Sequence, residues 1–208
     1  MPQFDKQCFP RHGSSHTGKD DSAHVPSPGN GFSPSGVDVP PMRLPHLDFI
    51  YRIVCDMDPS VSEIRNVDNT GVTRLVLPIL SGSVRGPRIE ATIVERSGAD
   101  WAEQVTPGKV FARLNARYTL KTNDGVFILV NAHGIYRSGP GQAEALTPTV
   151  SQDQVEYFTH INFEAPGGSP YDWMNGIFAL GVMTMFEGRP IIDCYRLTNF
   201  PGVPAAKL

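Results

Sequence analysis

Hydrophobic and polar residues alternate along most of the chain after residue 46, in short segments separated by turns. The first segment, 47–55, carries apolar side chains at every second position: Leu47, Phe49, Tyr51 and Ile53. A period of two is typical of a β-strand with one buried face. The same pattern predicts further strands at 73–80, 88–95, 109–122, 125–137, 154–165, 177–187 and 190–197.

The links between these segments have the composition of turns and loops. Asp124-Gly125 between two β-rich segments predicts a tight hairpin, and residues 187–189 predict another. Ser169 followed by Pro170 predicts a helix start, and Gly176 limits that helix to a short one. Residues 56–71 and 96–109 are expected to be loops, and 81–87 a turn.

Eight or nine strands with short links and no helical crossovers favour an antiparallel all-β domain, either a barrel or a sandwich. We predict a lipocalin-like antiparallel barrel of about eight strands with one short helix, covering residues 42–208. The interior of an eight-stranded barrel is wide enough for one small ligand.

Residues 1–41 have a different composition, with 7 Pro, 5 Gly and 6 Ser and very few aliphatic side chains. Such a segment buries too little apolar surface to offset its ordering entropy, so we expect a disordered N-terminal tail.

The net charge and the cysteine content limit the binding partners and the cellular compartment that we expect. The 208 residues carry a formal net charge of −3 and no run of Lys or Arg, which argues against nucleic acid and against a polybasic membrane anchor. The three cysteines form no secreted disulfide framework, so Cys55 and Cys194 are expected to be buried hydrophobic residues. Without a signal-like or membrane-spanning apolar run, a cytoplasmic protein is expected.

Three segments resemble the domain-of-unknown-function 3237 family: SGSVRGPRIEATIVERSGADW at 81–101, ARYTLKTNDGVFILV at 116–130 and YDWMNGIFALG at 171–181. The resemblance implies a closed or nearly closed antiparallel barrel with an internal cavity. It implies no established general activity, although fungal-type members resemble parts of natural-product pathways. The chain departs from the family pattern at Ser81 and Glu90, where the family tends to glycine.

Several common catalytic motifs are missing from the sequence. There is no Gly-x-Ser-x-Gly nucleophile elbow and no phosphate-binding Gly-x-x-x-x-Gly-Lys loop. The histidines His46, His133 and His160 are single and far apart, although pairing strands would still bring His133 beside His160. We therefore predict neither a metal site nor a cofactor.

Arg117 is the first candidate catalytic residue. Its strand face also carries Asn115, while the opposite face is apolar. This polar face either meets solvent or lines the cavity of a ligand-binding barrel. In the second case Arg117 would stabilise a developing oxyanion, with Asn115 binding the substrate beside it.

Two aspartates are the candidate proton donors or acceptors. Asp193 lies among apolar neighbours, with Tyr195 as a substrate-binding candidate on the same face, although an edge-strand charge explains it equally well. Asp100 precedes Trp101 in a predicted loop. This pair either caps one end of the barrel or places a carboxylate and an aromatic substrate contact at the cavity mouth.

Trp173 and Asn175 follow the predicted helix start. Trp173 either packs over the barrel end or forms an aromatic wall for a flat substrate. Asn175 either hydrogen-bonds a substrate oxygen or ends the helix.

These residues predict a small-molecule-binding barrel. The leading hypothesis is a cofactor-independent isomerase, cyclase or lyase that acts on an apolar carbonyl compound, with natural-product biosynthesis as the context. A non-catalytic carrier and a structural module with a filled interior are the alternatives. Exposed strand edges leave a homodimer open.

Overall fold

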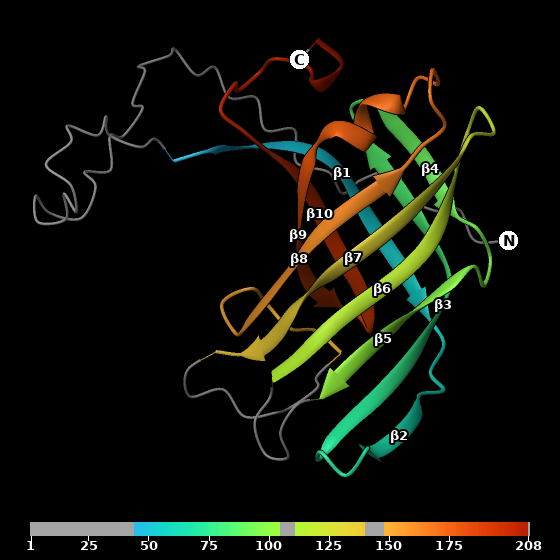
Figure 1. Ribbon diagram of the computed structural model, residues 1–208, viewed down its shortest axis with the longest axis vertical. Coiled ribbons are helices and arrows are strands. Elements are labelled where there is room, and N and C mark those ends of the chain that lie inside the picture. Colours follow the sequence, from blue (N-terminus) through green and yellow to red (C-terminus); the bar gives the residue numbers. More distant parts are fainter. Residues whose placement is uncertain (1–43, 105–110, 140–147, 208) are drawn as a thin grey trace, which may run out of the picture. The chain divides into compact units, whose positions relative to one another are not determined.

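The computed structural model describes residues 44–104, 111–139 and 148–207 (Figure 1). The predicted N-terminal tail, residues 1–41, lies outside them. From Pro45 onward the described residues form one compact unit. Its strands are β1 (His46–Met57), β2 (Ser62–Val67), β3 (Val72–Gly86), β4 (Ile89–Ile93), β5 (Gly98–Gln104), β6 (Phe111–Thr122), β7 (Phe127–Ser138), β8 (Val155–Glu164), β9 (Phe178–Phe186) and β10 (Arg189–Thr198). Two short 3₁₀ helices, η1 (Asp172–Gly176) and η2 (Ala205–Lys207), complete it.

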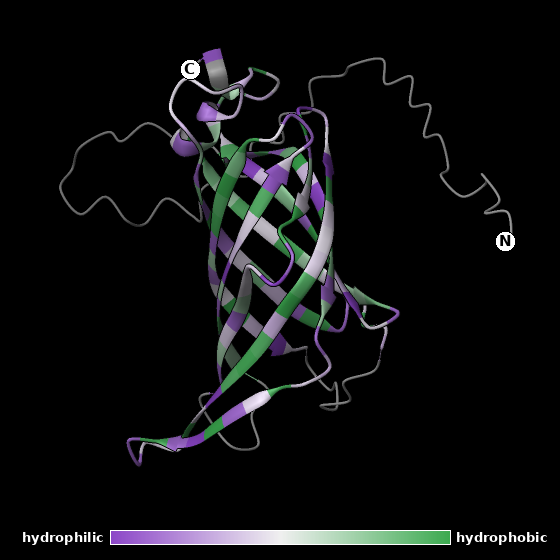
Figure 2. Cartoon of the chain, turned by 90° about the vertical axis from the view of Figure 1, so that its right-hand side faces the viewer, coloured by the Kyte–Doolittle hydropathy of each residue, from purple (hydrophilic) through white to green (hydrophobic). Residues whose placement is uncertain are grey.

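The strands close into an antiparallel barrel because β1 pairs with β10 on one side and with β3 on the other. Strands β4 and β5 follow each other along one line between β3 and β6, so together they occupy one of eight positions around the barrel. The predicted all-β antiparallel barrel is confirmed. Figure 2 shows hydrophobic and hydrophilic residues alternating along its strands.

Three predicted connections contain strands. The expected loop 56–71 includes β2, which pairs with the start of β3, and the expected loop 96–109 includes β5. The expected turn at 81–87 is largely the last part of β3, which pairs with β1 and β4. Strand β2 gave no periodic signal because nearly all of its side chains are exposed.

A β-bulge in β1 changes which side chains face the core. The pairing of β1 with β10 shifts between Phe49 and Tyr51. Leu47 and Phe49 are therefore on the outside, 50% and 43% exposed, whereas Tyr51 and Ile53 are fully buried. The prediction that all four share one face is wrong for this reason, since an extra residue reverses the alternation.

Helix η1 caps one end of the barrel, with Tyr171 and Met174 buried in the core. It is a single 3₁₀ turn whose N-cap is Tyr171, so the predicted helix start at Ser169 lies two residues too early. Ser169 instead accepts a hydrogen bond from Asp172 N at its carbonyl oxygen, which makes a turn before the helix. No helix in the described residues is long and apolar enough to cross a lipid bilayer.

Gly134 on β7 marks a close approach of two strands. A methyl group at its Cα would lie 1.9 Å from the carbonyl oxygen of Phe158 and 2.7 Å from the Cα of Thr159 on β8. Gly134→Ala is expected to lower the free energy of unfolding by about 1–3 kcal/mol, the usual cost of overpacking. Gly167→Ala is the control, because nothing lies within 4 Å of its added methyl. Equal urea midpoints for the two variants would contradict this close packing.

Candidate functional site

The inner side chains are more completely buried near η1 than at the opposite end of the barrel. Near η1, inward-facing side chains such as Ile53, Leu120 and Val130 are fully buried. Toward the end where β3 and β6 begin, several inward-facing side chains are only partly buried: Leu75, Leu77, Asp100, Ala112, Ala116, Tyr136 and Tyr157. Ala102 and Leu114, which lie among them, are buried. We call this less tightly covered part the open half.

Asp100 points into the open half. Cross-strand partners share a face of the sheet, and Asp100 lies opposite Leu77 on β3 and Ala116 on β6. Ala116 packs against the hydrophobic core, which identifies this face as the inner one. Burial raises the pKa of the Asp100 carboxyl, and a hydrogen bond of 2.9 Å from the backbone N–H of Asn115 opposes this increase only in part.

Three tyrosines face the barrel interior: Tyr51 and Tyr118, which are buried, and Tyr157, which is partly buried in the open half. Burial raises the pKa of Tyr157 well above its usual value, and the nearby charge of Asp100 raises it further. Burial likewise raises the pKa of Tyr118 and Tyr51. The Tyr51 hydroxyl lies beside Tyr118 and Cys194, yet it makes no hydrogen bond of ordinary geometry. These phenols stay protonated near neutral pH, so they offer O–H donors.

The two described cysteines are buried and free, as predicted. Burial raises the pKa of Cys55 and of Cys194 to about 12. A thiol with such a pKa stays protonated and is a poor nucleophile, so neither cysteine suits covalent catalysis.

Arg117 lies on the outside of the barrel, which corrects the expectation that its face lines the cavity. Its guanidinium Nε donates a 2.6 Å hydrogen bond to Asn131 Oδ1, and the side chain is exposed. Asn115 is exposed on the same outer face. The reason is that β6 turns its apolar side chains, Tyr118 and Leu120 among them, into the core.

Asp193 and Tyr195 also lie on the outer surface, because their neighbour Cys194 points into the core. Asp193 accepts two hydrogen bonds from the Arg52 guanidinium, of 2.6 and 2.7 Å. Tyr195 packs edge-on against Phe49, with ring centroids 5.7 Å apart. Neither side chain faces the interior, so the structure separates both from Asp100.

Trp101 is partly buried on the outer side of β5, opposite Val76. It therefore does not plug the barrel end. Asp100 and Trp101 belong to a strand rather than to the predicted loop, and consecutive strand residues point to opposite sides of the sheet. Only Asp100 of this pair faces the interior.

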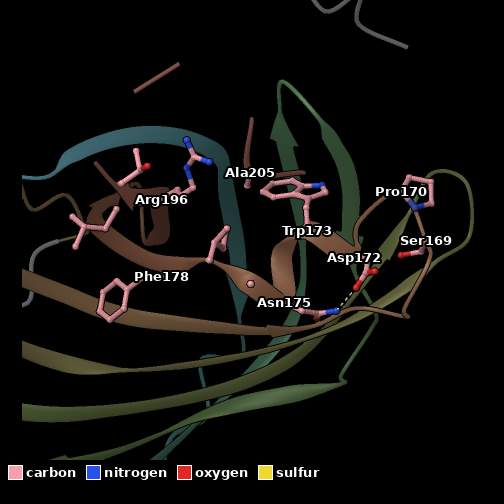
Figure 3. A pocket seen from close by; sticks show the side chains of 12 residues that line it. Ser169, Pro170, Asp172, Trp173, Asn175, Phe178, Arg196 and Ala205 are labelled. Carbon is pink, nitrogen blue, oxygen red and sulfur yellow. Dashed lines mark hydrogen bonds between the residues drawn. The ribbon is translucent and has the colours of Figure 1, made fainter. Parts of the chain in front are cut away.

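Trp173 and Asn175 lie at the capped end, beside a pocket of about 780 Å³ (Figure 3). Asn175 is fully used within the fold: it accepts a hydrogen bond from Ala165 N and donates to Ala165 O and to Asp172. Asn175 therefore holds η1 against the end of β8. Trp173 lines the pocket, and the Arg88 guanidinium lies 4.4 Å from its ring centroid.

The pocket at the capped end has the character of a binding surface. Hydrogen bonds from Gly168 N and Asn175 lower the pKa of Asp172, which keeps this carboxylate charged. Arg196 pairs with Asp48 at 2.6 Å and also donates to Val203 O. One Arg196 nitrogen and Trp173 Nε1 are buried without acceptors, but the two groups point apart (Figure 3). No proton-transfer pair converges here.

The two central histidines are neighbours on the outer surface. His133 lies directly opposite His160, and the His160 ring stacks on Phe178 with centroids 4.2 Å apart. Among the described residues, no three His, Cys, Asp or Glu side chains gather in a group suited to a metal ion.

Comparison with known proteins identifies a matching family and solved structures with a similar fold. A family model described as "Protein of unknown function (DUF3237)" matches residues 45–197. A β-barrel-like protein from Acinetobacter baumannii is 24% identical with a TM-score of 0.64, and the match covers 78% of this chain and 100% of that one. A protein of unknown function from Clostridium acetobutylicum is 23% identical with a TM-score of 0.61 over 74% and 99% of the chains. An enzyme from Penicillium herquei is 17% identical with a TM-score of 0.56 over 77% and 99%. No curated protein matches the sequence significantly. At these identities the likeness extends to the barrel fold alone.

The sequence analysis did not single out Tyr157 and Tyr118 as functional residues. Tyr118 was assigned to the apolar face of its strand, and the structure shows that this face is the inner one. Tyr157 alternates with Thr159, Ile161 and Phe163, which are buried. This alternation was the available signal for an inward-facing phenol.

Asp100→Asn is expected to stabilise the protein at neutral pH. Because the folded chain holds the Asp100 proton more tightly than the unfolded chain, it binds more protons in the interval above the ordinary pKa of 3.8. The free energy of unfolding of the wild type therefore falls as the pH rises through that interval. The amide of the variant does not titrate, so the variant avoids this decrease. Urea unfolding at several pH values should show a gain for the variant at pH 7 that shrinks below about pH 4.

Asp193→Asn is the matched control, since it breaks an ion pair on the outer surface. It should lower the free energy of unfolding, by up to about 1 kcal/mol. A destabilised Asp100→Asn with the same pH profile as Asp193→Asn would contradict the burial of Asp100.

Proposed function

The chain belongs to the DUF3237 family of proteins of unknown function, and we propose that it is a cofactor-independent enzyme that isomerises, cyclises or cleaves a small apolar carbonyl compound inside its barrel. The observation that carries this proposal is the Asp100 carboxyl on the inner face of the open half, with its pKa raised by burial, and the Tyr157 phenol that faces the same interior from β8. A titratable group with a shifted pKa in a hollow is a common mark of an acid–base site.

Proton transfer through Asp100 is the chemistry that this arrangement supports. As a base, the carboxylate takes a proton from the carbon beside the substrate carbonyl, and the C–H electron pair forms an enolate. The resulting carboxylic acid returns the same proton to another carbon, which isomerises the substrate. A raised pKa brings the carboxyl closer to the pH at which both steps proceed well.

Cyclisation and cleavage use the same relay. The enolate carbon attacks a second carbonyl carbon of the substrate, and protonated Asp100 then gives its proton to the new alkoxide. Cleavage is the reverse: Asp100 takes the hydroxyl proton, the carbon–carbon bond breaks to give a carbonyl and an enolate, and Asp100 then returns the proton to the enolate carbon. Protons and electrons balance in each case without a further reactant.

Tyr157 is the proposed partner for the developing oxyanion. Its phenol stays protonated because burial and the Asp100 charge raise its pKa, so it can donate a hydrogen bond to the enolate oxygen. Such a donor is most effective where water is scarce. Arg117, Asp193, Asn115 and Tyr195 have no part in this site, since they lie on the outer surface.

The lining of the open half indicates an apolar substrate. Leu75, Leu77, Ala112 and Ala116 share the inner face with Asp100. Ala116, directly opposite Asp100 on β6, is a small side chain. The related barrel from Penicillium herquei is described as an enzyme, which supports catalysis on this fold. Natural-product biosynthesis is the proposed context.

A carrier protein is the second candidate. It is favoured by the fact that, apart from Asp100, the inward side chains named here are apolar or neutral. A carrier would bind the same ketones and leave them unchanged, so turnover separates the two functions.

The test uses aromatic ketones with exchangeable α-protons in deuterated buffer, followed by NMR. The wild-type protein should accelerate the loss of the α-proton signals. Asp100→Asn should reduce this acceleration by roughly 10²–10⁴-fold, the usual contribution of a general base. Tyr157→Phe should reduce it by roughly tenfold or more, since it removes one oxyanion donor.

Asp193→Asn serves as the control and should exchange like the wild type, because its carboxylate faces outward. Exchange at the same rate in wild type and Asp100→Asn would refute the assigned base. Ketone binding without any exchange by the wild type would instead favour the carrier.

A further inference from the structure

The outer wall of the barrel is charged over β3 to β6. Outward side chains there form cross-strand ion pairs, such as Arg74 with Glu103 at 2.5 Å and Arg85 with Glu90 at 2.7 Å. Lys121 is exposed on β6. A charged, paired surface of this kind is typical of a wall that meets solvent.

The wall over β1, β10, β9 and β8 has the opposite character. Its strand register aligns Leu47, Leu197 and Phe178 in one row across three strands. The next row places Phe49 beside Tyr195. Phe158 on β8 lies opposite Val182 on β9. We call the six residues Leu47, Phe49, Phe158, Phe178, Tyr195 and Leu197 the outer apolar face.

Four side chains of this face leave a continuous apolar area exposed. Leu47, Phe49, Phe158 and Phe178 are 50%, 43%, 41% and 52% exposed. With about 200 Å² for each whole side chain, they leave roughly 400 Å² of apolar surface uncovered. That is the size of the largest patch on a typical monomer, and such patches mark interaction sites. The half-buried Tyr195 and Leu197 extend it toward the roughly 800 Å² per partner of a standard interface.

Oppositely charged side chains on this wall pair with each other. Arg52 and Asp193 lie in the row between Tyr195 and Ile191, and they bind each other through two hydrogen bonds of 2.6 and 2.7 Å. In a two-fold symmetric dimer a surface meets its own copy, so like charges face each other unless they are already paired. The Arg52–Asp193 pair and a second pair on this wall, Arg189 with Asp56 at 2.8 Å, are both satisfied within one copy, which meets this condition.

The eight strands of the wall offer no continuous free edge, because β1 pairs with both β10 and β3. The short strand β2 keeps one unpaired edge, but nearly all of its side chains are exposed and it has no apolar row of its own. The apolar surface for association therefore lies on a face of the barrel. We propose that two copies of this chain pack through their outer apolar faces as a two-fold symmetric dimer.

The test is the mass of the full-length protein in solution, measured by sedimentation or light scattering at micromolar concentration. The wild type should have about twice the chain mass of 22.7 kDa. Phe178→Asp places a charge in the face of each copy, so the dissociation constant should rise roughly thirtyfold or more.

Phe127→Asp is the matched control. Phe127 on β7 is 55% exposed, close to the 52% of Phe178, but it lies outside the face. Its variant should remain a dimer. Leu47→Asp, on β1, repeats the test on a second strand in case Phe178→Asp disturbs folding, which circular dichroism would reveal.

A wild-type protein that sediments at 22.7 kDa would overturn the proposal, because no dimer would then form at the concentration used. Equal effects of Phe178→Asp and Phe127→Asp on the dimer would overturn it as well. Neither outcome bears on Asp100, so the proposed chemistry is tested separately.

Discussion

The pairing of β1 with both β10 and β3 is the constraint from which the rest of this structure follows. This pairing closes the sheet into a barrel, and a barrel has an interior. In an eight-stranded barrel that inside is only as wide as a layer of side chains or one small ligand. Every second side chain of a strand then points into a confined, largely dry space and must be compatible with it. The apolar face of β6 takes the inner side, which sends Arg117 outward, and on β10 the inward-facing Cys194 leaves Asp193 on the outer side.

Irregular pairing places a carboxylate without a cationic partner among the described inner side chains, in contrast to Arg196, which pairs with Asp48. On β3, Val84 and Ile79 both face the core although their numbers differ by an odd count, because the register with β1 shifts between Asp56 and Met57. Beyond this shift, Ile79 pairs with Gly98, and Asp100 follows two residues later on the inner face. The break between β4 and β5 thus allows a carboxylate to point inward.

The strands with a clear period of two were predictable from sequence, since a buried face imposes that period. Strands β2 and β5 were not: the first buries almost nothing, and the second follows Arg96, a residue with positive φ that interrupts the line of β4. The alternation also does not say which face is inside. Both faces of β6 were correctly separated, yet Arg117 was placed as a cavity candidate because a polar interior was assumed. Asp100 was found, but as a loop residue, and Tyr157 lay on a predicted strand whose alternation indicates an inward side chain but not which residues it faces.

Strand β8 carries residues of both proposed surfaces, the interior site and the outer apolar face. Tyr157 faces the interior beside Asp100, and its neighbour Phe158 lies on the outer apolar face. Consecutive strand residues share a backbone but point to opposite sides, so contact at Phe158 reaches Tyr157 only through a strand held by hydrogen bonds to β7 and β9. Packing on the outside would thus stiffen the wall that carries the phenol. The open end, in contrast, is formed by the ends of the strands. Association through the wall would therefore leave the path for a substrate free.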